Sequence, residues 1–299
     1  MAAEKSRASE SGEGGGASTG AKRRGEDTQG AKRRGEEDAE APSTAAHIRE
    51  QVTTLVLAVA IALGIRAFVI EPFRIPSGSM LPTLLIGDHL FVNKFIYGAK
   101  IPFSDIRLPA LREPERGDVV VFAVARQPGR GSQRIYPADL RPDLPREDFV
   151  KRLVGLPGDR ISVRNDRLYV NGEPVDRVEI AGGFVDDHGS RLDVYQESLF
   201  DCEHAMLDDP QKWGLSKREM VVEPGRYFFM GDNRDNSNDS RGWGTVRKEE
   251  LKGPAFILYW SWNVTGNFFQ LLNPVNWFTA EKRWGRVFQR VKCGPVELD

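Results

Sequence analysis

The chain has little of two features that mark common classes of protein. It holds only two cysteines, Cys202 and Cys293, in 299 residues, which excludes a disulfide-dense scaffold and a four-thiolate zinc site. It has no basic excess, since 42 Lys and Arg face 43 Asp and Glu and the formal net charge is -1. The clustered positive surface of nucleic-acid-binding proteins is therefore not expected. Two cysteines still permit one disulfide bond in a domain outside the cytosol, and the sequence leaves their pairing open.

The first 50 residues lack aromatic side chains and are rich in Gly, Ala, Ser, Glu and Arg. A segment GAKRRGE at 20–26 recurs ten positions later, at 30–36. Such a composition cannot bury enough apolar surface to fold, so we predict a disordered tail over residues 1–50. The Lys-Arg-Arg clusters are candidates for contact with anionic lipid, but acidic residues follow each one, which favours a solvated tail.

The chain has a single long apolar run, VTTLVLAVAIALGIRAFVI over 52–70. Nineteen residues are about the number that cross a hydrocarbon core of roughly 30 Å, and Arg66 lies near one end, where it can snorkel to the headgroups. We therefore predict a transmembrane helix over 51–70. A buried core helix and a cleaved signal sequence are the alternatives, but a signal sequence begins near the N-terminus. Orientation stays open, because Arg49 and Arg74 balance one another across the run.

Residues 71–299 show the pattern of a mainly β domain. Short β-branched and aromatic runs bounded by turn residues occur at 88–98, 118–125, 148–155, 160–172 and 226–232. Asn165 and Asp166 predict the turn of a hairpin. Because long helices do not alternate with these strands, we predict antiparallel sheets and not a doubly wound parallel one. The more polar segment 174–223 is predicted to be an inserted lobe.

Ser79 is the first candidate for chemistry. It lies in IPSGSMLPT (75–83), nine residues beyond the apolar run, where Gly78 allows close backbone approach and Pro76 and Pro82 stiffen the segment. Such a serine suits a nucleophile near a membrane surface, although a Ser/Gly/Pro turn at a strand end has the same composition. None of the four histidines lies in a context that marks it as the base.

Lys151 is the candidate base. It stands inside the apolar run FVKRLVG (149–155), where strand alternation places it on one face with Phe149 and Leu153. Burial favours the neutral amine and lowers a lysine pKa, and a neutral lysine can activate a serine in a Ser/Lys dyad. The alternative is a lysine whose amine reaches solvent at a strand edge.

A dense polar loop, GDNRDNSNDSRGWG, covers 231–244. If Asp235, Ser237 and Asp239 are taken as the first alternating ligands of a calcium-binding EF-hand loop, the rest of the segment does not fit. Ser240 then takes the position of the required glycine, and Val246 takes that of the bidentate glutamate. We therefore expect no metal. The opposite charges of Asp239 and Arg241 predict a loop that bonds to itself and orients a catalytic amine.

These motifs occur in an order that resembles the bacterial type I signal peptidases, also called leader peptidases. The resemblance rests on PSGSMLPTL, GDVVVF, FVKRLVGLPGD and GDNRDNSNDSRGWG, and covers 71–98, 116–124, 148–172 and 227–253. It implies a serine endopeptidase that removes signal peptides from exported preproteins through an acyl-enzyme intermediate. The cut would follow small residues of the A-x-A type, with no metal and no cofactor.

The resemblance also implies the roles of particular residues. Ser79 would be the nucleophile and Lys151 its general base, while the hydroxyl of Ser77 and the backbone N–H of Ser79 would form the oxyanion hole. Ser237 would hydrogen-bond the lysine amine, with Asp239 and Arg241 as a supporting ion pair. The residues expected to line the substrate pockets are Phe73, Ile75, Leu84, Leu90, Phe149 and Val150.

A single anchor before the serine implies a cytoplasmic tail and a catalytic domain on the extracytoplasmic face of the cell membrane. The expected partners are preproteins and the lipid bilayer. Two alternatives are a membrane-tethered regulatory or self-cleaving Ser/Lys protease and a non-catalytic binding module. A module of that kind needs neither a hydroxyl at 79 nor an amine at 151.

Overall fold

A computed structural model describes residues 44–101, 104, 106–129, 133–186, 189–263, 275 and 279–294. Most of the tail predicted over 1–50 lies outside these residues. Its last part, from Thr44 to Glu50, is helical, so the helix begins earlier than the apolar run alone predicts.

The helix α1 spans Thr44–Phe68. Within the described residues one helix is long and apolar enough to cross a membrane, His47–Phe68, with a mean hydropathy of 1.8 and 0% of its apolar window buried. An unburied apolar surface of this length argues against a core helix. The helix ends two residues before the predicted boundary, because Glu71 precedes Pro72 and the chain there turns extended; Ile70 already belongs to the first strand.

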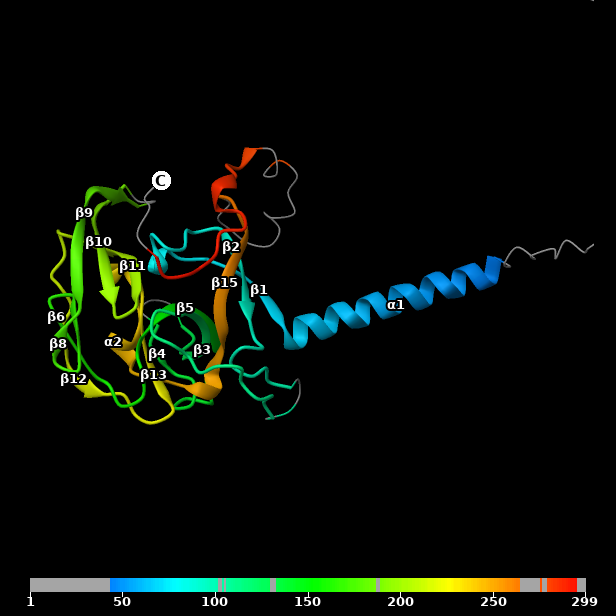
Figure 1. Cartoon of the computed structure of the whole chain (residues 1–299), viewed down its shortest axis with the longest axis horizontal. Coiled ribbons are helices and arrows are strands. Elements are labelled where there is room, and N and C mark those ends of the chain that lie inside the picture. The colour runs from blue at the N-terminus through cyan, green and yellow to red at the C-terminus, as the bar shows by residue number, and fades with distance from the viewer. Residues whose placement is uncertain are drawn as a thin grey trace, which may run out of the picture. The chain divides into compact units, whose positions relative to one another are not determined.

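The largest sheet contains eight strands, and every pairing in it is antiparallel. Its order is β1 (Ile70–Arg74), β2 (Asp88–Asn93), β15 (Leu251–Ser261), β3 (Val119–Arg126), β5 (Arg146–Gly155), β13 (Arg226–Met230) and β14 (Val246–Arg247), with β4 (Ile135–Pro137) beside β3. The long strand β15 runs alongside β2 in Figure 1. The prediction of a mainly antiparallel β protein is confirmed.

The predicted hairpin joins β6 (Arg160–Arg164) to β7 (Arg167–Val170). Its two turn residues have positive φ, 49° at Asn165 and 58° at Asp166, which is the geometry of the tightest hairpin turns. The strands β8 (Glu173–Pro174) and β12 (Lys217–Val221) complete this four-stranded sheet.

The inserted lobe is more regular than its sequence suggests. It contains β9 (Asp176–Val185), β10 (Arg191–Leu199) and β11 (Cys202–Asp208), which form a separate three-stranded antiparallel sheet. Leu192, Val194 and Leu207 are buried in a small cluster with Leu81. The sequence hides these strands because β9 contains Gly182 and Gly183, and its pairing with β10 shifts register between Leu192 and Val194.

Strand β5 has side chains in three hydrophobic clusters. Val154 belongs to one with the β6–β7 hairpin, Leu153 to a second with β3 and β13, and Val150 packs against a third with β2 and β15. A strand fixed on several sides holds its polar side chains in defined positions. The short helices whose bounds fall within the described ranges are η1 (Gly78–Met80), η2 (Arg234–Asn236), α2 (Ser240–Trp243), η3 (Lys248–Glu250) and η4 (Trp284–Arg286).

The two cysteines form a disulfide bond. Cys202 begins β11, and Cys293 lies in the C-terminal segment. Their Cα atoms are 5.0 Å apart, and their sequence separation is 91. Beside the bond, the N–H of Gly294 donates to the carbonyl of Glu203 at 2.9 Å. The inserted lobe is thus covalently joined to the C-terminal segment.

Removal of this disulfide should lower the thermal stability of the protein. In the chain-entropy description, a disulfide that closes a loop of this length removes entropy from the unfolded chain and so raises the free energy of unfolding by about 4–5 kcal/mol. We expect a reductant to lower the Tm of the detergent-solubilised protein, measured by circular dichroism. The double variant Cys202→Ala/Cys293→Ala should start from the lower Tm and not respond to reductant. An equal Tm for both proteins would contradict a stabilising bond.

Candidate active site

Ser79 lies in the short helix η1, and the polar loop holds the backbone on either side of its side chain. The N–H of Asn233 donates to the carbonyl of Ser79 at 3.2 Å, and the Asn233 side-chain amide donates to the carbonyl of Gly78 at 3.0 Å. A Cβ at Gly78 would lie 2.8 Å from the Leu81 side chain, which explains the glycine at that position. The sequence did not point to Asn233, because its partners are more than 150 residues away.

Lys151 projects from β5 toward this serine. Its side chain reaches the hydroxyl, with Nζ hydrogen-bonded to Ser79 Oγ at 2.5 Å. The residue is 4% exposed, and Nζ lies 5.3 Å from the centre of the Phe149 ring. The structure therefore brings together the two residues that the sequence proposed as nucleophile and base, on the strand face that alternation predicted.

Burial lowers the pKa of Lys151 from 10.5 to about 8. Asp239 and Asp232 act in the opposite direction, and the positive charge of Arg241 lowers it further. With a pKa near 8, about one molecule in ten carries the neutral amine at pH 7. A lysine in this state can accept a proton from a hydroxyl under physiological conditions.

The polar loop 231–244 bonds to itself through the ion pair of Asp239 and Arg241. Arg241 Nε and Nη2 each donate to one carboxylate oxygen at 2.9 Å, and the N–H of Gly231 donates to the same carboxylate at 3.0 Å. Burial alone would raise the pKa of Asp239, but these partners outweigh it and hold the pKa below its usual value. The carboxylate is therefore charged yet already neutralised by its own arginine.

Gly231 lies between the side chain of Ser237 and the backbone of Ser79. A Cβ there would lie 2.3 Å from Ser237 Oγ and 2.5 Å from the carbonyl oxygen of Ser79, so Ser237 and Ser79 flank this glycine. Ser237 Oγ is buried beside the Asp239 carboxylate, and its hydrogen bond is one of the interactions that lower the pKa of Asp239; a bond from Ser237 to the lysine amine stays a prediction. Ser77, just before η1, is exposed, and its hydroxyl does not cap that helix.

Five of the six residues proposed to line the substrate pockets lie in one apolar cluster. Ile75, Leu84 and Leu90 are at most 3% exposed, while Phe73 and Val150 are half-buried at its margin. Phe149 packs against a different cluster, with β3 and β13, since it lies on the opposite face of β5 from Val150. The buried three can form only the floor of a pocket, and the half-buried pair its accessible wall.

A second buried ion pair, absent from the sequence interpretation, lies next to Lys151. Arg152 donates to both oxygens of Asp232 at 2.8 and 2.7 Å, and the hydroxyl of Thr83 donates to the same carboxylate at 2.6 Å. This network joins β5, the end of β13 and the segment after the serine. The sequence offers one signal for it, a second charge beside Lys151 within an apolar strand.

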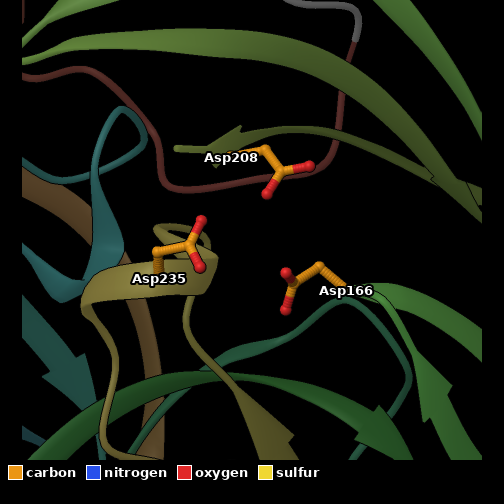
Figure 2. A group of neighbouring side chains, drawn as sticks. All are labelled: Asp166, Asp208 and Asp235. Carbon is orange, nitrogen blue, oxygen red and sulfur yellow. The ribbon is translucent and has the colours of Figure 1, made fainter. Parts of the chain in front are cut away.

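Three carboxylates, those of Asp166, Asp208 and Asp235, point toward one another (Figure 2), with candidate ligand atoms within 4.8 Å. Burial and a hydrogen bond with Asp235 raise the pKa of Asp208 to about 6, and burial raises that of Asp166. Oxygen donors of this kind suit a hard divalent cation, and equally a shared proton. The expectation that the protein needs no metal stays a prediction.

A serine hydroxyl bonded to a buried lysine amine, on a mainly antiparallel β fold that follows an apolar helix, is the arrangement of serine proteases that use lysine in place of histidine. The family model described as "Signal peptidase, peptidase S26" matches residues 48–260. The chain belongs to this family, whose members are serine endopeptidases that remove signal peptides.

Curated relatives agree over most of the chain. Signal peptidase I of Pseudomonas aeruginosa is 40% identical over 214 residues, which cover 68% of this chain and 69% of the relative. Signal peptidase I of Pseudomonas fluorescens gives the same identity and coverage. Signal peptidase I of Rickettsia typhi is 33% identical over 241 residues, covering 73% of this chain and 82% of the relative.

Gly231→Ala should separate Ser79 from the polar loop, because the added Cβ would overlap Ser237 Oγ and the Ser79 carbonyl. A displacement of about 1 Å in a catalytic geometry costs on the order of 100-fold. We expect a loss of this size in kcat/KM for preprotein cleavage. Gly242→Ala, in the same loop, is the matched control, since the nearest atom to its Cβ is 3.8 Å away. Equal activity of the two variants would contradict this account of Gly231.

Proposed function

We propose that this protein is a membrane-anchored signal peptidase in which Ser79 is the nucleophile and Lys151 the general base. The observation that carries the proposal is the 2.5 Å hydrogen bond between Ser79 Oγ and an amine that is 4% exposed. A buried lysine with a lowered pKa beside a hydroxyl is a costly arrangement, and such groups cluster at working sites.

The reaction follows from this geometry. The neutral amine of Lys151 takes the proton of Ser79 as Oγ attacks the scissile carbonyl carbon, and the resulting ammonium gives that proton to the leaving amine when the C–N bond breaks. Lys151 then deprotonates a water molecule, which attacks the ester carbon on Ser79. The resulting ammonium returns this proton to Ser79 Oγ as the C–O bond breaks, and the signal peptide leaves with a free carboxylate. The hydroxyl of Ser77 and the backbone N–H of Ser79 stabilise the oxyanion in both steps. Ser237, Asp239 and Arg241 keep the amine oriented.

The substrate binds as an extended segment beside the dyad. Among the described strands β1 pairs with β2 alone, and β5 pairs with β13 only from Arg152 onward, so backbone groups next to the site remain available for an added strand. Phe73 and Val150 form the pocket wall over a floor of fully buried side chains. Because the floor residues are already packed against one another, a substrate side chain that contacts this cluster has to be small, which supports cleavage after an A-x-A sequence.

The anchor and the disulfide support an extracytoplasmic catalytic domain over 71–299 and a cytoplasmic tail over 1–50. Ser79 follows the end of α1 by 11 residues, which reach at most about 40 Å when fully extended, so the site stays near the bilayer that holds the apolar part of the substrate. A disulfide between Cys202 and Cys293 persists in an oxidising compartment and not in the cytosol.

Ser79→Ala and Lys151→Ala should each lower cleavage of a labelled preprotein at least about 1,000-fold, as loss of a nucleophile or its base does in other serine proteases.

In the unmodified protein kcat/KM should fall about tenfold per pH unit below a midpoint near 8, since only the neutral amine is a base. Both predictions are measured with purified protein in detergent, and the new N-terminus is mapped.

Lys248→Ala removes a half-buried lysine that pairs with Glu113 and serves as the control, with activity unchanged. Full cleavage by either dyad variant would overturn the assignment of roles. A cut away from an A-x-A boundary would favour a regulatory protease instead.

The topology has a separate test in inverted and right-side-out membrane vesicles that contain the full chain. Protease added to right-side-out vesicles should degrade the domain that follows α1 and leave an epitope tag at the N-terminus protected. Inverted vesicles should give the opposite result. Protection of the catalytic domain in right-side-out vesicles would refute the proposed orientation.

A further inference from the structure

The inserted lobe is joined directly to the polar loop of the active site. The end of strand β11 pairs with the start of this loop. The N–H of Leu207 donates to the carbonyl of Asp232 at 2.8 Å, and Leu207 forms a parallel bridge with Asn233. Two residues further, the N–H of Asp209 donates to the Asp235 carboxylate at 2.7 Å. The lobe is therefore bonded to the loop that flanks the dyad and is not an independent appendage.

A buried ion pair strengthens this junction. Glu197 of β10 accepts hydrogen bonds on both carboxylate oxygens from Arg234 of η2, one of them from Nη1 at 2.9 Å. Each side chain is 1% exposed. His204 Nε2, on β11, lies 3.3 Å from the same carboxylate and 3.9 Å from that of Asp232.

The charges within this pair are fixed. Burial would raise the pKa of Glu197, but Arg234 outweighs burial and holds it well below the usual value. Burial and the charge of Arg152 lower the pKa of His204, so the imidazole is neutral at pH 7. Arg234 thus has one full counter-charge in direct contact, and that charge comes from the inserted lobe.

Arg234 in turn connects the two ends of the loop. Its Nε donates to the carbonyl of Gly231 at 3.2 Å, and its own carbonyl accepts from Arg241 Nη2 at 2.5 Å. Gly231 touches Ser79 and Ser237, as described above, and Arg241 holds Asp239. Whatever fixes Arg234 therefore fixes the loop on both sides of the dyad.

We infer that Glu197 is a positioning residue for the dyad, which acts from the inserted lobe by holding Arg234 and, through it, the loop 231–241 against Lys151. This inference rests on the proposed function. Without Glu197, a buried guanidinium would lack its partner and would move toward water, since an unpaired buried charge is strongly unfavourable. Gly231 and Arg241 would move with it, and water would enter beside the amine.

Entry of water has a specific consequence for Lys151. The groups that act on its pKa are Asp239, Asp232 and Arg241, but burial is the largest influence. Hydration would therefore raise the pKa from about 8 toward 10.5. The neutral fraction at pH 7 falls about tenfold for each unit of that rise. If Glu197 only stabilised the fold of the lobe, its loss would lower the amount of folded protein, and activity would fall by the same factor at every pH.

The test compares pH profiles of kcat/KM in the full-length protein, with a labelled preprotein as substrate. The acid limb is the part of the profile in which kcat/KM falls as the pH is lowered. In Glu197→Gln we expect the midpoint of this limb to move at least one pH unit higher. The value of kcat/KM should be lowered tenfold or more at pH 7 and be largely recovered near pH 10. Glu179→Gln, an exposed carboxylate on the neighbouring strand β9, is the matched control and should keep the original profile.

A second variant covers the case in which Glu197→Gln fails to fold. Glu197→Leu/Arg234→Met removes both charges, and such replacements of buried pairs often preserve or increase stability. It should be folded by circular dichroism, form the Cys202–Cys293 disulfide, and still show the displaced acid limb. An unmoved profile in this folded double variant, or a loss that is equal at every pH, would overturn the inference.

The dyad variants separate this outcome from a failure of the proposed function. If Ser79→Ala or Lys151→Ala keeps full cleavage, the assignment of the dyad is wrong, and the inference falls with it. If both lose cleavage while the Glu197 profiles stay unmoved, the dyad stands and only the role of Glu197 is refuted.

Discussion

The removal of one amine from water is the constraint on which the site depends. Lys151 lies in a strand packed against three hydrophobic clusters, and two carboxylates lie near enough to influence it. Each of these acids is already bound by an arginine, Asp232 by Arg152 and Asp239 by Arg241. Among the described residues the amine therefore has no counter-ion of its own, and desolvation is the largest influence on its pKa. If either arginine were absent, its acid would stabilise the ammonium form and weaken the base.

Local patterns in the sequence were sufficient for much of the fold. A single apolar run predicted the helix, and the turn residues Asn165 and Asp166 predicted the hairpin in which both have positive φ. The strands of the inserted lobe were missed because their periodicity is interrupted. Strand β9 contains two glycines, its pairing with β10 shifts register between Leu192 and Val194, and Glu197 and His204 are charged or polar residues at buried positions. The helix begins seven residues before the predicted start and ends two residues before the predicted end. The end was misplaced because the extended segment before Pro72 is itself apolar.

The candidate site shows the same division between local and distant information. Ser79 and Lys151 could be proposed because a short motif surrounds each one, and the motifs together resemble one family. The partners of Asp232 and Arg234 could not, because Arg152 is 80 residues from Asp232 and Glu197 is 37 residues from Arg234. Pairing between buried charges depends on which strands the fold brings together, and a single sequence carries no record of that. Its only local sign is an excess of charge in apolar surroundings.

The junction between β11 and the Asp232–Asn233 segment limits how this protein can be recombined with its relatives. A chimaera that exchanged only the inserted lobe would separate Glu197 from Arg234 and Leu207 from Asn233. The disulfide extends this dependence to the C-terminal segment, because Cys202 belongs to the lobe and Cys293 does not. The inserted lobe, the polar loop and the C-terminal segment would therefore have to be exchanged together, although they are far apart in the gene. The unit that can be transferred between relatives is a group of neighbouring segments in space and not a continuous piece of chain.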